Sequence, residues 1–302
     1  MKFLIFAIVY PIIWITSRLP MSILYLKSDV SFFILYYLIG YRKKVVTSNL
    51  KAAFPDKTEK EIKSISKKFF QHFTDLIFES IKSFSISEKE IKKRYQYTNT
   101  EIIDKLTKEG KNIALVGSHQ ANWEWAFGLP LFVDISCLGA YTKIQNKYFE
   151  KVIYNSRIRF GYNGCPTGLF NNQLQERFKT KQQSLYMLLS DQSPMPIKTR
   201  HWATFLNNFV PVHTGAETIA KKFNLAVVNI NTTKIKRGYY TSDLQLITTS
   251  PNDFENYDLT EKYLKITEAH IAKQPEFYLW SHKRFKHKGK YDDWLKLKKK
   301  TK

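Results

Sequence analysis

Two short apolar runs constrain the fold of this chain more than any other feature. Residues 113–117 (Ile-Ala-Leu-Val-Gly) and residues 184–191 lack the alternation of a half-exposed strand, so both are predicted to be strands buried on two faces. Residues 225–231 are a third such run, and helical patterns over 147–160 and 213–223 lie between the runs. Alternating strands and helices predict an α/β fold with a mainly parallel central sheet flanked by helices.

The first third of the main body has helical periodicity. Thr58-Glu59-Lys60-Glu61 forms a capping box, and apolar residues follow at helical spacing from Ile62 to Phe84. A shorter helix is expected from Ser87, and another over 101–108. We expect the long helix to pack across the sheet with its apolar stripe inward.

The amino-terminal residues 1–41 are strongly apolar and predict a helical membrane-anchoring segment. A helix over residues 3–16 would be roughly 21 Å long at ~1.5 Å per residue, which is short of the ~30 Å hydrocarbon core. Residues 15–20 offer a poor cleavage site, so the segment is expected to be retained. The alternative is an ordinary hydrophobic helix packed on the core.

Net charge indicates an acidic partner. The 302 residues include 48 Lys and Arg against 26 Asp and Glu, a balance of +22 that favours anionic lipid, an acidic carrier protein or nucleic acid. Nucleic acid is not expected, because no helix-turn-helix, zinc-finger or RNA-binding-sheet signature accompanies the charge. Part of the positive charge is concentrated at the end of the chain. We therefore expect three parts: the anchoring segment 1–41, a main domain over 42–290 and a basic tail over 291–302.

The residues best placed for chemistry follow the first buried strand. His119 comes just after that strand, where open α/β sheets bind ligands, and Glu124 follows five residues later. A His held by a carboxylate is a general base that activates a hydroxyl. Other chemistries fit less well: His201 and His213 make no metal-ligand spacing with His119, Gly-x-Ser-x-Gly is absent, and no nucleotide-binding loop is present. No metal or cofactor is therefore expected.

The motif His119-Gln120-Ala121-Asn122-Trp123-Glu124 resembles the His-x4-Asp/Glu motif of glycerolipid-type acyltransferases. Its Asn-Trp-Glu form is similar to that of the bacterial lipid A biosynthesis lauroyl and myristoyl acyltransferases. Further blocks match that family in order and cover nearly the whole chain: residues 41–46, 49–50, 53–55, 191–192, 211–215, 275–280 and 282–284.

The resemblance implies a glycerolipid acyltransferase-like fold and the roles of several residues. His119 would be the general base, Glu124 would orient and charge-balance it, and Arg159 would stabilise the oxyanion. Arg159 could equally be a solvated helix residue that faces anionic lipid. The substrate-binding part of the site would comprise Asn122, Trp123, Asp191 and Gln192.

The resemblance also implies the substrates and the location. The donor would be an acyl carrier protein thioester or acyl-CoA, and the acceptor a hydroxyl of a lipid A precursor or related glycolipid at the cytoplasmic face of the inner membrane. The chain departs from the family at residues 204–208 (Thr-Phe-Leu-Asn-Asn), where members carry a Phe-Phe-Gly-Arg-like turn. An acyl-CoA-dependent enzyme acting on another acceptor, such as an aminolipid, therefore stays open. The alternative from another class is a non-catalytic, basic protein that binds membrane surfaces or nucleic acid.

A fatty acyl chain needs shielding from water, so the sequence predicts an apolar tunnel beside His119. The nearest candidates for its walls are Trp123, Trp125, Phe127, Leu129, Leu131 and Phe132. These side chains either line the tunnel or fill the space between helix and sheet, as aromatic residues do in ordinary cores.

Overall fold

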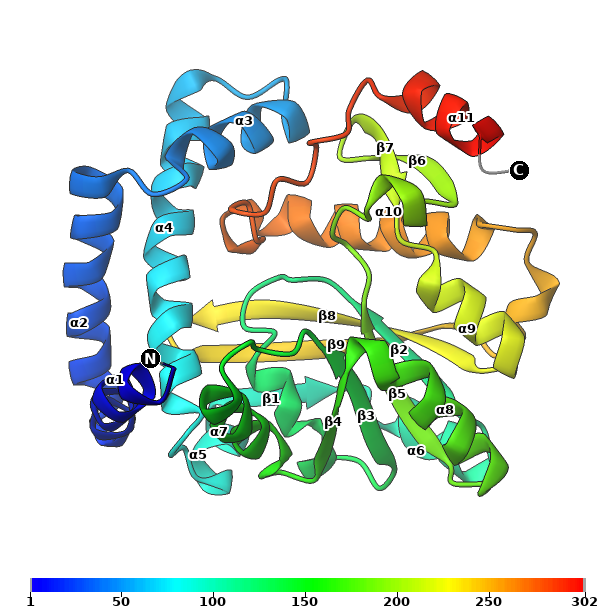
Figure 1. Cartoon of the computed structure of the whole chain (residues 1–302), viewed down its shortest axis with the longest axis horizontal. Coiled ribbons are helices and arrows are strands. Elements are labelled where there is room, and N and C mark those ends of the chain that lie inside the picture. Colours follow the sequence, from blue (N-terminus) through cyan, green and yellow to red (C-terminus); the bar gives the residue numbers. More distant parts are fainter. Residues whose placement is uncertain (1, 301–302) are drawn as a thin grey trace.

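A seven-stranded sheet runs through the middle of the structure, a computed structural model that describes residues 2–300 (Figure 1). The strand order is β1-β9-β8-β2-β5-β3-β4, in which β8 and β9 are antiparallel and the other neighbouring pairs are parallel. The predicted α/β fold with a mainly parallel sheet is thus confirmed. The strands are β1 (Tyr95–Thr98), β2 (Ile113–Gly117), β3 (Ser136–Tyr141), β4 (Tyr162–Pro166), β5 (Ser184–Leu189), β8 (Ala226–Lys236) and β9 (Tyr239–Thr248).

Helices cover both faces of this sheet (Figure 1). Because successive side chains of a strand point to opposite faces, β2 contributes Ala114 and Val116 to one buried cluster and Ile113 and Leu115 to the other. The helices are α1 (Lys2–Arg18), α2 (Met21–Phe33), α3 (Lys43–Ala53), α4 (Glu59–Lys82), α5 (Glu88–Arg94), α6 (Glu101–Lys108), α7 (Lys147–Ile158), α8 (Phe170–Lys179), α9 (Gly215–Phe223), α10 (Asp258–Lys273) and α11 (Tyr291–Lys300).

Helix α4 begins at the predicted capping box. Thr58 Oγ1 accepts a hydrogen bond from Glu61 N, and Glu61 Oε2 accepts one from Thr58 N at 2.8 Å, so two backbone N–H groups are satisfied. Its inward stripe is buried as expected, for example at Ile62, Phe69 and Leu76. Helix α4 therefore forms one wall against which both the sheet and the amino-terminal helices pack.

The amino-terminal segment folds as α1, α2 and a π-helical continuation over Ile34–Ile39. Residues Met21–Ile39 make one helix long and apolar enough to cross a membrane, by length and composition. Only a narrow face is buried against α4, and the apolar residues around it are exposed. A helix packed wholly on the core would bury them. The exposed set includes Phe3, Leu4, Ile8, Ile12, Ile15, Leu26, Val30, Phe33, Leu38 and Ile39.

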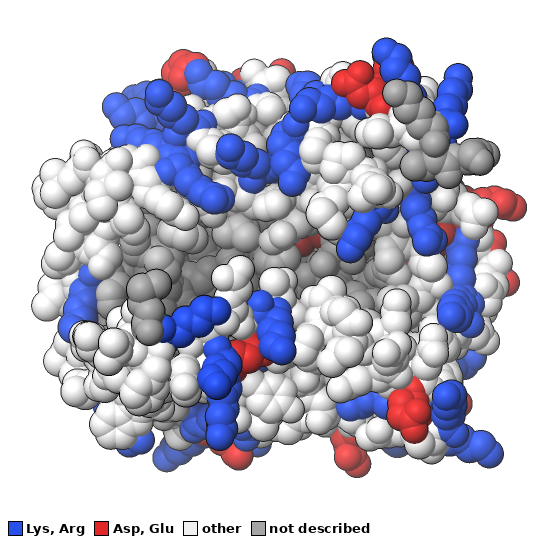
Figure 2. Space-filling view, viewed as in Figure 1, with Lys and Arg blue, Asp and Glu red and all other residues white. Residues whose placement is uncertain are grey.

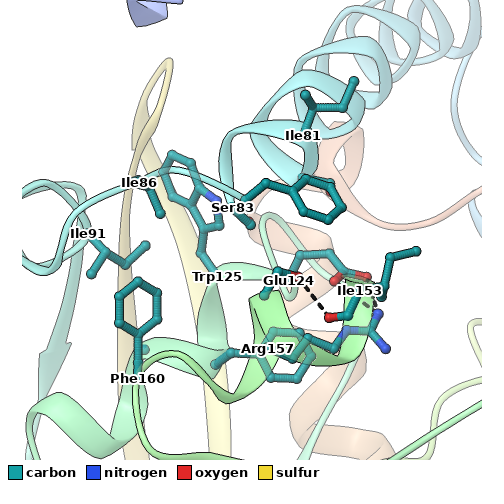
Figure 3. A pocket seen from close by; sticks show the side chains of 14 residues that line it. Ile81, Ser83, Ile86, Ile91, Glu124, Trp125, Ile153, Arg157 and Phe160 are labelled. Carbon is teal, nitrogen blue, oxygen red and sulfur yellow. Dashed lines mark hydrogen bonds and ion pairs between the residues drawn. The ribbon is translucent and has the colours of Figure 1, made fainter. Parts of the chain in front are cut away.

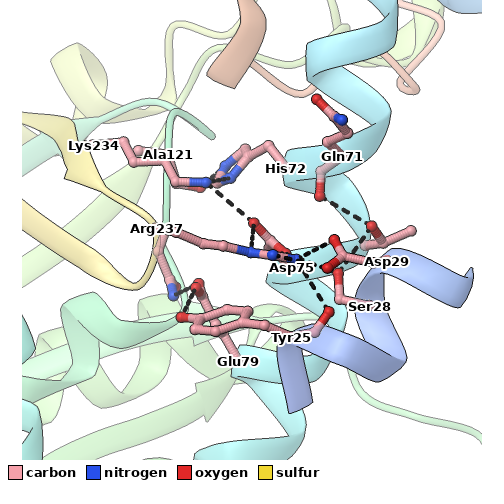
Figure 4. A network of polar contacts seen from close by, with 12 residues as sticks. Tyr25, Ser28, Asp29, Gln71, His72, Asp75, Glu79, Ala121, Lys234 and Arg237 are labelled. Carbon is pink, nitrogen blue, oxygen red and sulfur yellow. Dashed lines mark hydrogen bonds and ion pairs between the residues drawn. The ribbon is translucent and has the colours of Figure 1, made fainter. Parts of the chain in front are cut away.

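Polar contacts fix α2 on α4 (Figure 4). Ser28 Oγ of α2 donates to Asp75 Oδ1 of α4 at 2.8 Å, and both side chains are buried. Arg237, in the β8–β9 turn, pairs with Asp75 and with Asp29 of α2, each at 2.6 Å. Three separate segments are thus joined by one ionic network.

A two-stranded hairpin, β6 (His201–Phe205) and β7 (Asn208–Val212), lies apart from the main sheet. Its turn is the segment where the chain departs from the family pattern. Leu206 and Asn207 both have positive φ angles, of 48° and 62°, as a tight hairpin turn requires. The amides of Asn207 and Asn208 donate to the carbonyls of Ala53 and Ala52 at the end of α3, at 3.0 and 2.8 Å.

The basic tail is helical over its described part. Tyr291 and Trp294 of α11 pack against Trp202 of the hairpin, with ring centroids 5.4 and 6.1 Å apart. Met1 of the predicted anchoring segment and Thr301 and Lys302 of the tail lie outside the described residues.

Candidate active site

His119 and Asp191 meet at the carboxyl end of the sheet because of strand register. Gly117, the last residue of β2, pairs with Leu189, the last residue of the parallel neighbour β5. His119 and Asp191 each follow two residues later, and His119 Nδ1 lies 2.7 Å from Asp191 Oδ1. The Asp191 side chain is 1% exposed and that of His119 is 18% exposed. The imidazole is therefore held by a buried carboxylate and keeps access to solvent.

The hydrogen bonds of the ring assign its tautomer. Gln192 Nε2 lies 3.2 Å from His119 Nε2, and an amide N–H can only donate to a ring nitrogen that carries a lone pair. The proton of the neutral ring is therefore on Nδ1, where it is donated to Asp191. Trp123 packs edge-on against the ring with centroids 5.3 Å apart. This arrangement leaves Nε2 as the basic atom.

Electrostatics strengthen that base. Burial lowers the pKa of His119, but the charge and hydrogen bond of Asp191, with a further contribution from the charge of Glu124, raise it above its ordinary value. Burial raises the pKa of Asp191, and the adjacent His119 lowers it by more, so the net shift is downward. Asp191 is consequently ionised whenever His119 titrates.

Glu124 has a different partner from the one expected. Its carboxylate lies 3.2 Å from Arg157 Nη2, and the hydrogen bond to the His119 ring that we expected from Glu124 comes from Asp191. Its charge still acts on His119 through space. Asp191 thus contacts the ring directly, whereas Glu124 reaches it only through its charge.

Arg159 is engaged elsewhere in the structure. Its guanidinium donates to the carbonyls of Ser83 and Ile86 at 3.0 and 2.9 Å, just after α4 ends. Neither contact involves His119, so these contacts lend no support to the expected role in oxyanion stabilisation. Ser83 is the C-cap residue of α4, so the bond to its carbonyl caps the helix, whereas Ile86 belongs to the turn beyond it.

Asn122 is fully buried and shapes the loop after His119. Its Nδ2 donates to Glu79 Oε2 at 2.7 Å, and its Oδ1 accepts from Trp125 N at 2.9 Å. Ala121, just before it, has a φ of +53°, which is unusual for a residue with a side chain. Of the four residues expected to bind substrate, Asn122 thus serves the backbone, whereas Asp191, Gln192 and Trp123 contact His119.

An apolar cavity of about 210 Å³ lies next to the Glu124–Arg157 pair (Figure 3). Of the six expected tunnel residues, Trp125 and Phe127 line it, whereas Phe132 packs on Tyr97. The other lining residues are Ser80, Ile81, Ser83, Phe84, Ile86, Ile91, Gly128, Ile153, Ser156 and Phe160.

Two further residues near Asp191 received no role from the sequence, although both belong to a block shared with the family. His282 Nε2 accepts a hydrogen bond from Ser193 N at 3.2 Å, and burial lowers the pKa of His282 to about 4. Arg284 is 1% exposed, and its Nη1 donates to the carbonyl of Pro211 at 3.2 Å. The sequence feature that could have indicated these two residues is the basic run 282–284, which directly follows the apolar residues 277–280 and Ser281.

The chain was compared with models of known protein families and with curated proteins. A family model described as bacterial lipid A biosynthesis acyltransferase matches residues 2–287. No curated protein matches the chain.

Proposed function

This chain belongs to the bacterial lipid A biosynthesis acyltransferases, and we propose that it transfers a fatty acyl group from an acyl carrier protein or coenzyme A thioester to a hydroxyl of a lipid A precursor or related glycolipid. The observation that carries the proposal is the His119–Asp191 pair at the carboxyl end of the sheet, with Nε2 of the ring left basic. Such a pair removes a proton from a hydroxyl.

In the proposed reaction, His119 takes one proton from the acceptor hydroxyl and gives it to the leaving thiolate. The acceptor hydroxyl replaces the Gln192 amide at Nε2 and gives its proton to that nitrogen while its oxygen attacks the thioester carbonyl. Asp191 stabilises the imidazolium that forms. The tetrahedral intermediate then breaks its C–S bond, and the departing thiolate takes the proton from Nε2. The products are the acylated lipid and the free thiol, and the base is regenerated.

Lipid analysis tests the proposed acceptor. A strain that lacks this chain should contain a glycolipid short of one acyl group, and the chain supplied on a plasmid should restore it. Mass spectrometry identifies the missing group and the acceptor together. Glycolipids unchanged in the deletion strain, with another lipid class short of an acyl group, would reassign the acceptor.

The apolar cavity is the proposed site of the donor's acyl chain. Phe127→Ala enlarges this cavity and should shift the preferred donor toward chains longer by a few carbons, because each newly buried methylene contributes ~0.8 kcal/mol. Competition between donors of different length, with products separated by mass spectrometry, measures the shift.

Phe132→Ala is the matched control for that experiment. It removes the same ring from the same segment, but Phe132 packs on Tyr97 with centroids 4.9 Å apart and does not line the cavity. It should lower the melting temperature without a change in chain-length preference. Equal preferences in the two variants and the wild type would place the acyl chain elsewhere.

We propose that the chain attaches to the cytoplasmic face of the inner membrane through α1 and α2. The exposed apolar residues of both helices support this, as does the excess of basic residues, since anionic lipid attracts Lys and Arg. Figure 2 shows that Lys and Arg outnumber Asp and Glu on the face in view and lie on both sides of a hollow.

Deletion of residues 1–18 should weaken membrane attachment. High salt alone should not release the full-length chain, because apolar burial is insensitive to screening. Fractionation of cell membranes, with and without a high-salt wash, measures both effects. The control variant, Lys43→Gln with Lys44→Gln, removes charge next to the apolar segment and should remain bound. A truncated chain that stays fully bound at high salt would assign the attachment to residues 21–39 alone.

A further inference from the structure

A buried carboxylate outside the proposed chemistry contacts the loop that follows His119. Glu79 of α4 is fully buried. Its Oε1 accepts a hydrogen bond from Tyr25 of α2 at 2.8 Å, and its Oε2 accepts from Asn122 of the loop and Tyr240 of β9, each at 2.7 Å. The bond between Tyr25 and Glu79 is visible in Figure 4.

The surroundings of Glu79 favour an acceptor. Burial raises its pKa to about 7, while Lys234 and the hydrogen bonds from the two tyrosines act in the opposite direction. Asn122 Nδ2 can only donate, whereas the Tyr25 and Tyr240 hydroxyls can donate or accept, so the oxygen at the Oε2 position has to be an acceptor. A side chain at position 79 without an acceptor would leave the buried Asn122 amide unpaired.

Glu79 holds both ends of the turn after His119. At one end it accepts the side-chain amide of Asn122, and at the other its backbone carbonyl accepts Trp125 Nε1 at 3.1 Å. Asn122 Oδ1 closes the turn by accepting Trp125 N. The backbone between His119 and this turn includes Ala121 with its positive φ, a conformation that persists only when its neighbours hold it.

We propose that Glu79 is a positioning residue for acyl transfer: through Asn122 it fixes the turn that follows His119, and so keeps Nε2 in reach of the acceptor hydroxyl. This inference rests on the proposed role of His119 as general base. Glu79 touches neither substrate nor the reacting atoms in this scheme, and acts only through the loop.

Glu79→Leu should lower kcat on the order of 10- to 100-fold, because the turn loses its partner and a ~1 Å displacement of a reacting group costs ~10²-fold. The matched control is Glu217→Leu: Glu217 is also buried and accepts from Tyr257 N and Thr260 N, but it joins α9 to α10. That variant should lower the melting temperature and keep the wild-type kcat.

The conservative variant gives the sharper test. In Glu79→Gln the carbonyl oxygen can take the Oε2 position and accept from Asn122 and Tyr240, while the amide donates to the Tyr25 hydroxyl. This variant removes the charge and keeps the hydrogen bonds of the turn, so it should recover most of the kcat that Glu79→Leu loses. Asn122→Ala removes the same contact from the loop side and should lose kcat as Glu79→Leu does.

The outcomes distinguish failure of the positioning role of Glu79 from failure of the proposed role of His119 as general base. Wild-type kcat in Glu79→Leu or Asn122→Ala, or a Glu79→Gln variant no more active than Glu79→Leu, would overturn the positioning role and leave His119 as the base. Loss of kcat in Glu79→Leu and Asn122→Ala with recovery in Glu79→Gln supports it, and His119→Ala in the Glu79→Gln background must then abolish the recovered rate. If Glu79→Leu does not fold, Asn122→Ala and Glu79→Gln decide by the same comparison.

Discussion

Replacement of His119 by alanine should lower the rate of acyl transfer by about 10²- to 10⁴-fold, the range expected when a general base is lost. The protein should remain folded, because the imidazole lies in a loop and is partly exposed. Steady-state rates with an acyl thioester and an acceptor lipid measure the loss, and thermal unfolding monitors the fold.

His201→Ala is the matched control. His201 also pairs with a carboxylate, through Nε2 and Glu261 Oε1 at 2.8 Å, and it stacks on Tyr257. It begins β6, apart from the main sheet. Its removal should leave the rate unchanged. A His119→Ala protein that turns over acyl thioester at the wild-type rate would exclude the mechanism proposed here.

Asp191→Asn should be the second most damaging change, with a loss of roughly 10³- to 10⁴-fold by analogy with other His–carboxylate pairs in which an amide holds the wrong tautomer. It also has a signature in pH. A base works only when unprotonated, so activity should rise with pH through the raised pKa of His119. Without the Asp191 charge, burial of the ring dominates and the pKa of His119 falls. The rise of activity with pH, which is the acidic limb of the profile, should therefore move to lower pH. Profiles of kcat/KM against pH measure both effects.

Glu124→Gln distinguishes the two carboxylates. Because Glu124 contacts Arg157 and reaches His119 only through space, its neutralisation should cost less than Asp191→Asn and should move the acidic limb by less, in the same direction. If Glu124→Gln were the more damaging of the two, Glu124 rather than Asp191 would be the partner of His119 during catalysis.

The sequence predicted the parts of the fold whose signal is local. The strands β2 and β5 are apolar runs, β8 begins within the run predicted over 225–231 and continues to Lys236, and α4 carries a capping box and a helical stripe. Strand β9 escaped prediction because it buries polar residues as well as apolar ones: Ser242 is fully buried and donates to the Tyr95 hydroxyl. The Ser242 hydroxyl also lies 2.8 Å from Thr232 Oγ1 of the antiparallel neighbour β8, and such a contact between strands leaves no local signal in the sequence.

Part of the candidate site could be predicted residue by residue, whereas its pairing could not. His119, Asp191 and Gln192 were all expected in the site, but the carboxylate nearest in sequence, Glu124, was expected to orient the ring. Which carboxylate does so depends on the register between β2 and β5, 72 residues apart at His119 and Asp191. Periodicity within one segment carries no information about the register between two.

The ionic network between α2, α4 and the β8–β9 turn has a mechanical consequence. Ser28, Asp75 and Arg237 join the apolar helix to the sheet without a hinge, so the catalytic domain cannot swing on a tether. In the membrane attachment proposed above, the depth at which α2 lies would fix the height of His119 above the lipid surface. An acceptor whose hydroxyl did not reach that height would have to be lifted partly out of the leaflet, so acceptors would be selected in part by headgroup length.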